Sequence, residues 1–125
     1  MIQGTTALFK FKMPCTKTEC EWIQIKFWQT TPQGSYPLIL KTLSCCEIKD
    51  NPKELYVSLT ETETMKFSPA RKLKVQLRGK NAVTGTIFSH PIKLYNIYPI
   101  NDDAEIILPD HDEVIILDGQ SIVID

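Results

Sequence analysis

The sequence predicts an all-β fold: an antiparallel β-sandwich with one short helix and an acidic C-terminal arm that ends in a hairpin. Three observations lead to this prediction. Apolar and polar residues alternate through several short segments separated by turn residues, one helix-start signal interrupts them, and charge is divided unevenly along the chain. The chain has 125 residues, 42% of them hydrophobic, which is enough for one domain with a substantial core. We expect a sandwich body at residues 1–98 and an arm at residues 99–125.

The strands of the first half are predicted from this alternation. Residues 5–13 alternate and are closed by Pro14, and residues 22–28 alternate in the same way. Residues 30–35 have the composition of a turn. The next strand covers residues 38–43, and residues 45–48 either extend it or form a short neighbour.

The second half begins with a turn at residues 50–52 and a strand at residues 55–59. Thr60 and Glu63 have the spacing of a capping box, which predicts a short helix that runs through Phe67 and stops at Ser68-Pro69. A strand at 73–78, a loop at 79–85 and an extended stretch at 86–97 complete the predicted body. Within that last stretch Pro91 indicates an edge or a bulge. Several short strands joined by turns favour a sandwich.

The charge is opposite in the body and the arm. Residues 1–100 contain all 14 Lys and Arg but seven Asp and Glu, a sum of +7, whereas residues 101–125 contain eight acids and no Lys or Arg, a sum of −8. Asp118-Gly119 lies between two apolar segments, which predicts a hairpin. Because an isolated hairpin is marginal in water, we expect the arm to pack on its own body or on a neighbouring copy. Its interface candidates are Ile106, Leu108, Ile116, Ile122 and Ile124.

The body offers two further groups of interface candidates. Trp22 and Trp28 lie on the face of their strand opposite Ile23, Ile25 and Phe27, so either the second sheet covers them, which would bury the strand on both faces, or they anchor an interface, and we expect burial. Lys72, Lys74 and Arg78, with Lys80, place charges roughly 6.6 Å apart along a strand. They form a solvated face, a docking surface for an acidic arm, or a phosphate-binding surface. Nucleic acid is the weakest of these readings because no aromatic stacking platform accompanies the charges.

Several other sites are not expected. The four cysteines (Cys15, Cys20, Cys45 and Cys46) lack zinc-ligand spacing and a secretory signal, so we expect reduced, structural thiols. The acids around His111 lack the spacing of a calcium loop and are expected to form a solvated turn. No run reaches the ~18 apolar residues of a membrane span. We expect no cofactor, no catalytic residue and no small-molecule substrate, because no local spacing assembles a nucleophile with a base.

Four segments resemble small proteins encoded in prophages of Gram-positive gut bacteria. They are Ile2–Thr6 leading into the Phe9/Phe11 strand, Ile23–Phe27, Val57–Phe67 and Leu73–Arg78, and the resemblance covers roughly residues 2–95. Ala70 stands where the group usually has Gly after Pro, and the acidic arm is longer than the group would suggest.

The resemblance implies an immunoglobulin-like sandwich and a non-enzymatic structural or assembly role in a phage particle. The partners would be other copies of the chain or other phage structural proteins, and the protein would be made in the bacterial cytoplasm and end in the virion. The alternative is a stand-alone sandwich that binds carbohydrate or protein on the surface around residues 28–36. A small hydrolase is a third reading, disfavoured for want of a site.

Overall fold

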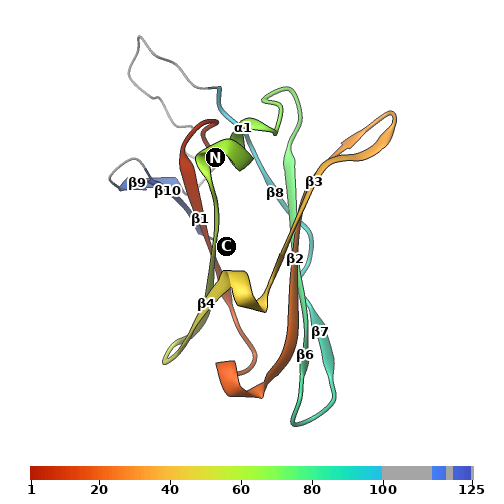
Figure 1. Ribbon diagram of the computed structural model, residues 1–125, viewed down its shortest axis with the longest axis vertical. Coiled ribbons are helices and arrows are strands. Elements are labelled where there is room, and N and C mark those ends of the chain that lie inside the picture. The colour runs from red at the N-terminus through yellow and green to blue at the C-terminus, as the bar shows by residue number, and fades with distance from the viewer. Residues whose placement is uncertain (100–113, 118–119, 125) are drawn as a thin grey trace.

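Phe9 and Phe27 lie against each other at the centre of the molecule, with ring centroids 5.1 Å apart. They come from two β-sheets that pack as a sandwich (Figure 1). The structure, a computed structural model, describes residues 1–99, 114–117 and 120–124. The predicted all-β sandwich is confirmed.

The first sheet has the strand order β4-β5-β1-β10-β9. Neighbouring strands in this sheet are antiparallel, except for β1 and β10, which are parallel. The strands are β1 (Thr6–Lys12), β4 (Cys46–Asp50), β5 (Lys53–Leu59), β9 (Val114–Leu117) and β10 (Gln120–Ile124).

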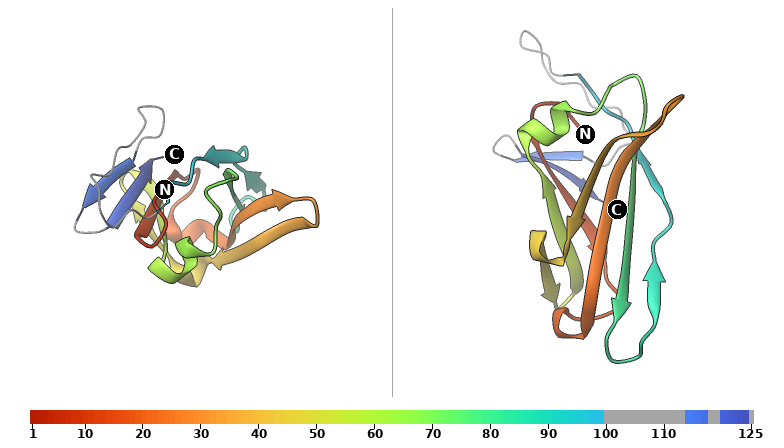
Figure 2. Two further views of the ribbon diagram at one scale, coloured as in Figure 1. Left: turned by 90° about the horizontal axis from the view of Figure 1, so that it is seen from above. Right: turned by 45° about the vertical axis from the view of Figure 1, so that its right-hand side comes forward.

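The second sheet has the order β3-β2-β6-β7, and β8 also pairs with β6. All of these pairs are antiparallel. The strands are β2 (Cys20–Thr31), β3 (Gly34–Thr42), β6 (Leu73–Asn81), β7 (Ile87–Ser89) and β8 (Lys93–Tyr95). The hairpin of β2 and β3 projects beyond the end of the sandwich in both views of Figure 2.

The core follows the alternation seen in the sequence. The residues that the four central strands contribute to the hydrophobic core between the sheets are Ala7, Phe9, Phe11, Ile23, Ile25, Phe27, Leu55, Val57, Leu59, Leu73, Val75 and Leu77. In each strand these positions are two residues apart, which places them on one face of the sheet. The sequence therefore predicted the inward face of each of these strands correctly.

The short helix α1 (Glu61–Met65) connects the two sheets and begins with the predicted capping box. The Glu63 amide donates to Thr60 Oγ1 at 3.2 Å, and the Thr60 amide donates to Glu63 Oε1 at 2.9 Å. Thr64 is buried in the helix, and its hydroxyl donates to the Thr5 carbonyl at 2.8 Å. The helix ends two residues earlier than predicted, and Phe67 enters the core from the loop that follows.

Two predicted connections are shorter in the structure. The turn expected at residues 30–35 is wrong at both ends, because β2 continues to Thr31 and β3 starts at Gly34. The loop expected at 79–85 is also partly wrong, since β6 continues through Gly79 to Asn81. A Cβ at Gly79 would lie 2.5 Å from the Phe88 ring and 2.6 Å from Ile23 Cδ1, so a side chain here would force these groups to shift, and the glycine serves close packing rather than a turn.

Other local predictions are settled by the structure. Residues 45–48 do not extend β3: a 3₁₀ turn at Leu43–Cys45 leads the chain into β4 in the other sheet. The extended stretch at 86–97 is divided into β7 and β8, and Pro91 lies between them as expected. Asp118-Gly119 and the run at residues 106–108 lie outside the described residues. On either side of Asp118-Gly119, β9 and β10 pair antiparallel.

Candidate functional site: the outer face of the second sheet

Strand β2 is central in its sheet and presents two different faces. Ile23, Ile25 and Phe27 belong to the core, whereas Trp22 and Trp28 do not. The interpretation that the opposing sheet covers both tryptophans is therefore wrong. The predicted burial is confirmed for Trp28, which is 7% exposed, but Trp22 is only half-buried, and groups other than the opposing sheet must cover Trp28.

The cover of Trp28 comes from its own face of the sheet. The Lys26 ammonium lies 4.5 Å from the centroid of the Trp28 ring, a cation–π contact. Leu38 on β3 and Lys74 on β6 are the register partners of Trp28 on its two sides. Directly opposite residues on neighbouring strands are close enough for their side chains to touch.

The strand registers define one continuous surface, which we call the outer face. Leu40 pairs with Lys26, and Lys26 pairs with Gln76. Leu94 on β8 pairs with Lys74, and Ile87 on β7 pairs with Lys80. The outer face consists of Trp22, Gln24, Lys26, Trp28, Leu38, Leu40, Lys74, Gln76, Arg78, Lys80, Ile87 and Leu94.

Large aliphatic side chains on this face are open to solvent. Leu38 is 45% exposed, Leu40 50% and Leu94 53%. A groove of about 340 Å³ runs between Leu38 and Leu40 on one side and Gln76 and Arg78 on the other. Single exposed apolar residues are common on protein surfaces, but Leu38 and Leu40 on β3 and Leu94 on β8 share one sheet face with two tryptophans, and an apolar surface of this kind is typical of an interaction site.

The charge of the outer face is positive. Lys26, Lys74, Arg78 and Lys80 lie on it, and the Lys80 ammonium lies 3.1 Å from a carboxylate oxygen of Glu21. Lys74 donates to the Thr30 hydroxyl at 2.7 Å, a contact that leaves its charge in place. A partner that fits this face would be acidic and apolar.

The predicted interface residues are distributed over three places. Trp22, Trp28, Lys74 and Arg78 meet on the outer face, and Lys72 lies in the loop just before β6 rather than in the strand. Ile116, Ile122 and Ile124 belong to β9 and β10, which join the other sheet. Ile106 and Leu108 lie outside the described residues.

Sequence reasoning missed Leu38, Leu40 and Leu94. The alternation within β3 was visible, but which of its two faces met Trp28 depends on the β2–β3 register. That register contains an irregularity between Trp28 and Thr30, which no local pattern announces.

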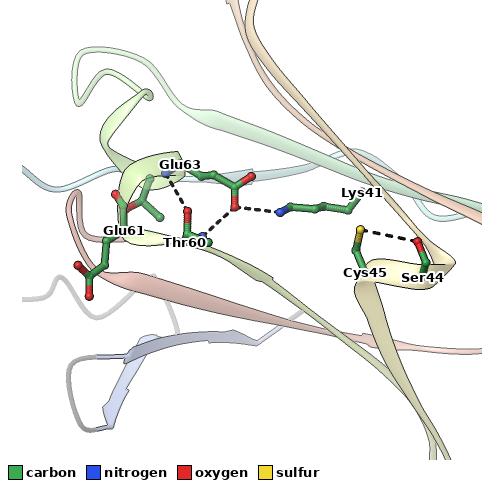
Figure 3. A network of polar contacts seen from close by, with 7 residues as sticks. Lys41, Ser44, Cys45, Thr60, Glu61 and Glu63 are labelled. Carbon is green, nitrogen blue, oxygen red and sulfur yellow. Dashed lines mark hydrogen bonds and ion pairs between the residues drawn. The ribbon is translucent and has the colours of Figure 1, made fainter.

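A second cluster of polar side chains lies between α1 and β3 (Figure 3). The Lys41 ammonium lies 2.9 Å from Glu63 Oε1, the same oxygen that accepts from the Thr60 amide. Partial burial raises the pKa of Glu63, but the Lys41 hydrogen bond and the Thr60 amide outweigh it, so the pKa lies below its ordinary value. This cluster fastens the helix to the sheet.

Cys45 lies at the edge of the same cluster and is exposed. Hydrogen bonding from the Thr42 backbone, then from the Ser44 and Thr42 side chains, together with the charge of Lys41, lowers the pKa of its thiol. By contrast, burial raises the pKa of Cys46 to about 12. Among the described residues, no three His, Cys, Asp or Glu side chains gather in a way that could hold a metal ion. In the same part of the chain, no helix is long and apolar enough to cross a membrane.

Comparisons of this chain with protein-family models, with curated proteins and with solved structures found no match.

Proposed function

We propose that the chain is a non-enzymatic assembly protein of a phage particle, and that it works by binding a neighbouring subunit on its outer face. The observation that carries this proposal is a set of half-exposed leucines, Leu38 and Leu40 on β3 and Leu94 on β8, which flank the tryptophans and cations of β2 and β6. Burying an aliphatic side chain fully is worth roughly 1.5–3 kcal/mol, so three half-exposed ones leave a substantial gain for a partner.

The composition of the outer face matches that of a protein interface. Tryptophan and arginine are enriched at such interfaces, and Trp22, Trp28 and Arg78 lie among the leucines. Two copies of this basic face would repel each other. The contact is therefore heterologous, between the outer face of one copy and an acidic surface of the next. The chain itself supplies such chemistry, because residues 101–125 hold eight acids and no Lys or Arg.

We also propose that the sandwich is immunoglobulin-like. In that fold one sheet contains strands D, E and B in this order, and the other contains C′, C, F and G. The orders β4-β5-β1 and β3-β2-β6-β7 correspond to these two sheets. This agreement supports the fold that the prophage resemblance implies, and that resemblance is the basis for placing the protein in a phage particle.

The alternative of a carbohydrate-binding module is less well supported by the same surface. Sugars commonly stack on open aromatic faces, but Lys26 already lies over the Trp28 ring and Trp28 is almost fully buried. Tyr36, at the projecting end of β3, is exposed beside a second groove. Both the outer face and the groove beside Tyr36 are open to a protein partner. We propose the outer face, because exposed apolar side chains and positive charge occur together there.

The test is incorporation into particles. A prophage-carrying host is deleted for the gene and complemented with wild type, with the double variant Leu38→Asp/Leu40→Asp, or with the control Gln33→Asp/Thr84→Asp. The control adds the same charge at exposed turn positions off the outer face. We expect the wild type and the control to be present in purified particles and the double variant to be lost from them, with a lower particle yield. Particles that form normally without the gene and never contain the protein would contradict the proposal.

A further inference from the structure

The edge of β1 has no partner from the body of the sandwich. Residues 1–99 supply β4, β5 and β1 to the first sheet, in that order. In the immunoglobulin arrangement the position beyond β1 belongs to strand A, which precedes strand B in the chain. Here the residues before β1 do not form such a strand, since Ile2 makes an isolated bridge to Tyr98 instead.

The C-terminal strand β10 occupies this position (Figure 1). It runs parallel to β1 in the register Thr6↔Gln120 to Lys10↔Ile124, and β9 pairs with its other side. Without β10, the backbone N–H and C=O groups along one side of a strand that carries Phe9 and Phe11 would be left unpaired. A long unpaired edge of this kind recruits a strand from another chain.

The connection between the body and this strand pair is long. Residues 100–113 separate Pro99 from β9, and a chain of that length spans at most ~50 Å when fully extended. The two packed sheets of one sandwich are only about 10 Å apart, so a linker of this length gives the strand pair covalent reach beyond its own body.

We propose that the β9–β10 pair also completes the β1 edge of a second copy, so that copies are joined by strand exchange. The exchanged form makes the same β1–β10 ladder as the closed chain, which is why such exchange has a low energetic cost and depends mainly on protein concentration. This inference rests on the proposed function, since it adds to the outer-face contact a second link between subunits at the β1 edge.

The test uses two full-length proteins, each with one added cysteine, so that a disulfide between the two added cysteines can form only between copies. One carries Leu8→Cys and the other carries Ile122→Cys, positions that are register partners. Both also carry Cys45→Ser, which removes the exposed native thiol. Of the other native thiols, Cys15 is buried, and the pKa values of Cys20 and Cys46 are raised to about 12. The proteins are unfolded together, refolded at high concentration and oxidised.

A matched control replaces Ile122→Cys with Ile115→Cys. Ile115 is the partner of Ile122 on β9 and is therefore one strand further from β1. Adjacent strands are about 4.8 Å apart, which a disulfide can bridge, whereas two strand spacings exceed the ~7 Å limit between Cα atoms. A chain that carries both Leu8→Cys and Ile122→Cys, oxidised when dilute, reports the closed form.

We expect a disulfide-linked species of twice the 14.3 kDa chain mass from the Leu8→Cys and Ile122→Cys mixture, and its loss in the Ile115→Cys control. Equal cross-linking in both mixtures, or none in the first, would overturn strand exchange. If the mixture fails while Leu38→Asp/Leu40→Asp still abolishes incorporation into particles, strand exchange is wrong and the proposed function stands. If the mixture succeeds and incorporation is unaffected, the proposed use of the outer face is wrong.

Discussion

We predict that the buried side chain of Gln29 stabilises the loop between α1 and β6. It is 1% exposed and makes three hydrogen bonds to that loop. Its Nε2 donates to the Ser68 carbonyl at 2.8 Å and to the Arg71 carbonyl at 2.9 Å, and its Oε1 accepts from the Ser68 amide at 2.9 Å. Gln29→Ala would leave one backbone donor and two acceptors without this partner.

The magnitude follows from these three bonds. A net contribution of about 0.5–1.5 kcal/mol each gives a total between about 1.5 and 4.5 kcal/mol. Ser68 and Arg71 are themselves exposed, so water can reach part of the vacated site and the lower half of this range applies. We expect Gln29→Ala to lower the free energy of unfolding by about 2–3 kcal/mol, and the melting temperature by roughly 4 °C per kcal/mol.

Urea unfolding followed by circular dichroism measures this loss, with Gln33→Ala in the exposed β2–β3 turn as the control. A second variant tests the direction of the hydrogen bonds. In Gln29→Glu a carboxylate would face two carbonyl oxygens, so its folded pKa would be raised and its neutral form favoured. Its stability relative to wild type should therefore fall as pH rises above about 4.3. A Gln29→Ala loss no larger than that of Gln33→Ala would refute the reasoning.

Three further predictions concern other parts of the fold. Gly79→Ala should cost about 1–3 kcal/mol in urea unfolding, because its Cβ would lie 2.5 Å from the Phe88 ring, and a loss equal to that of exposed Thr84→Ala would contradict this packing. Glu63→Gln should cost about 1 kcal/mol at pH 7. The folded pKa of Glu63 is lowered, so its contribution to the free energy of unfolding is present above an unfolded pKa of about 4.3 and is lost as pH falls through the folded pKa. A stability difference between Glu63→Gln and wild type that does not change with pH would be contrary evidence. Iodoacetamide at neutral pH should modify Cys45, whose thiol pKa is lowered, before Cys46, whose pKa is about 12. All four thiols should titrate once the chain is unfolded without reductant. Modification of Cys46 at the same rate as Cys45, or fewer than four free thiols, would count against reduced cysteines with these pKa differences.

The sequence was sufficient for the local features of the fold. Alternation identified the inward faces of β1, β2, β5 and β6, because burial on one side of a strand requires a period of two. The spacing of Thr60 and Glu63 identified the start of α1, since a capping box is formed within four residues.

The features that the sequence did not reveal depend on residues far apart in the chain. Gln29 binds Ser68 and Arg71, which lie 39 and 42 residues away, and no local pattern distinguishes it from an exposed glutamine. Gly79 was predicted to lie in a loop, because the Phe88 ring that leaves no room for a side chain at this position comes from β7 and is not visible in the local sequence. The tryptophans and the cations of the outer face were predicted as two separate groups of interface candidates, and both their union on one face and the leucines beside them required the strand pairing.

The central claim, that copies meet on the outer face, can be tested with the chain's own fluorophores. Its two tryptophans, Trp22 and Trp28, both lie on that face. Sedimentation velocity and tryptophan emission with acrylamide quenching are measured on the same samples, over a wide range of protein concentration and at low and high salt. The account predicts that larger species appear as concentration rises, with a blue-shifted emission and weaker quenching, and that salt reverses both because it screens the acidic and basic surfaces. A chain that stays monomeric, or that associates while its tryptophan emission and quenching stay constant, would contradict it.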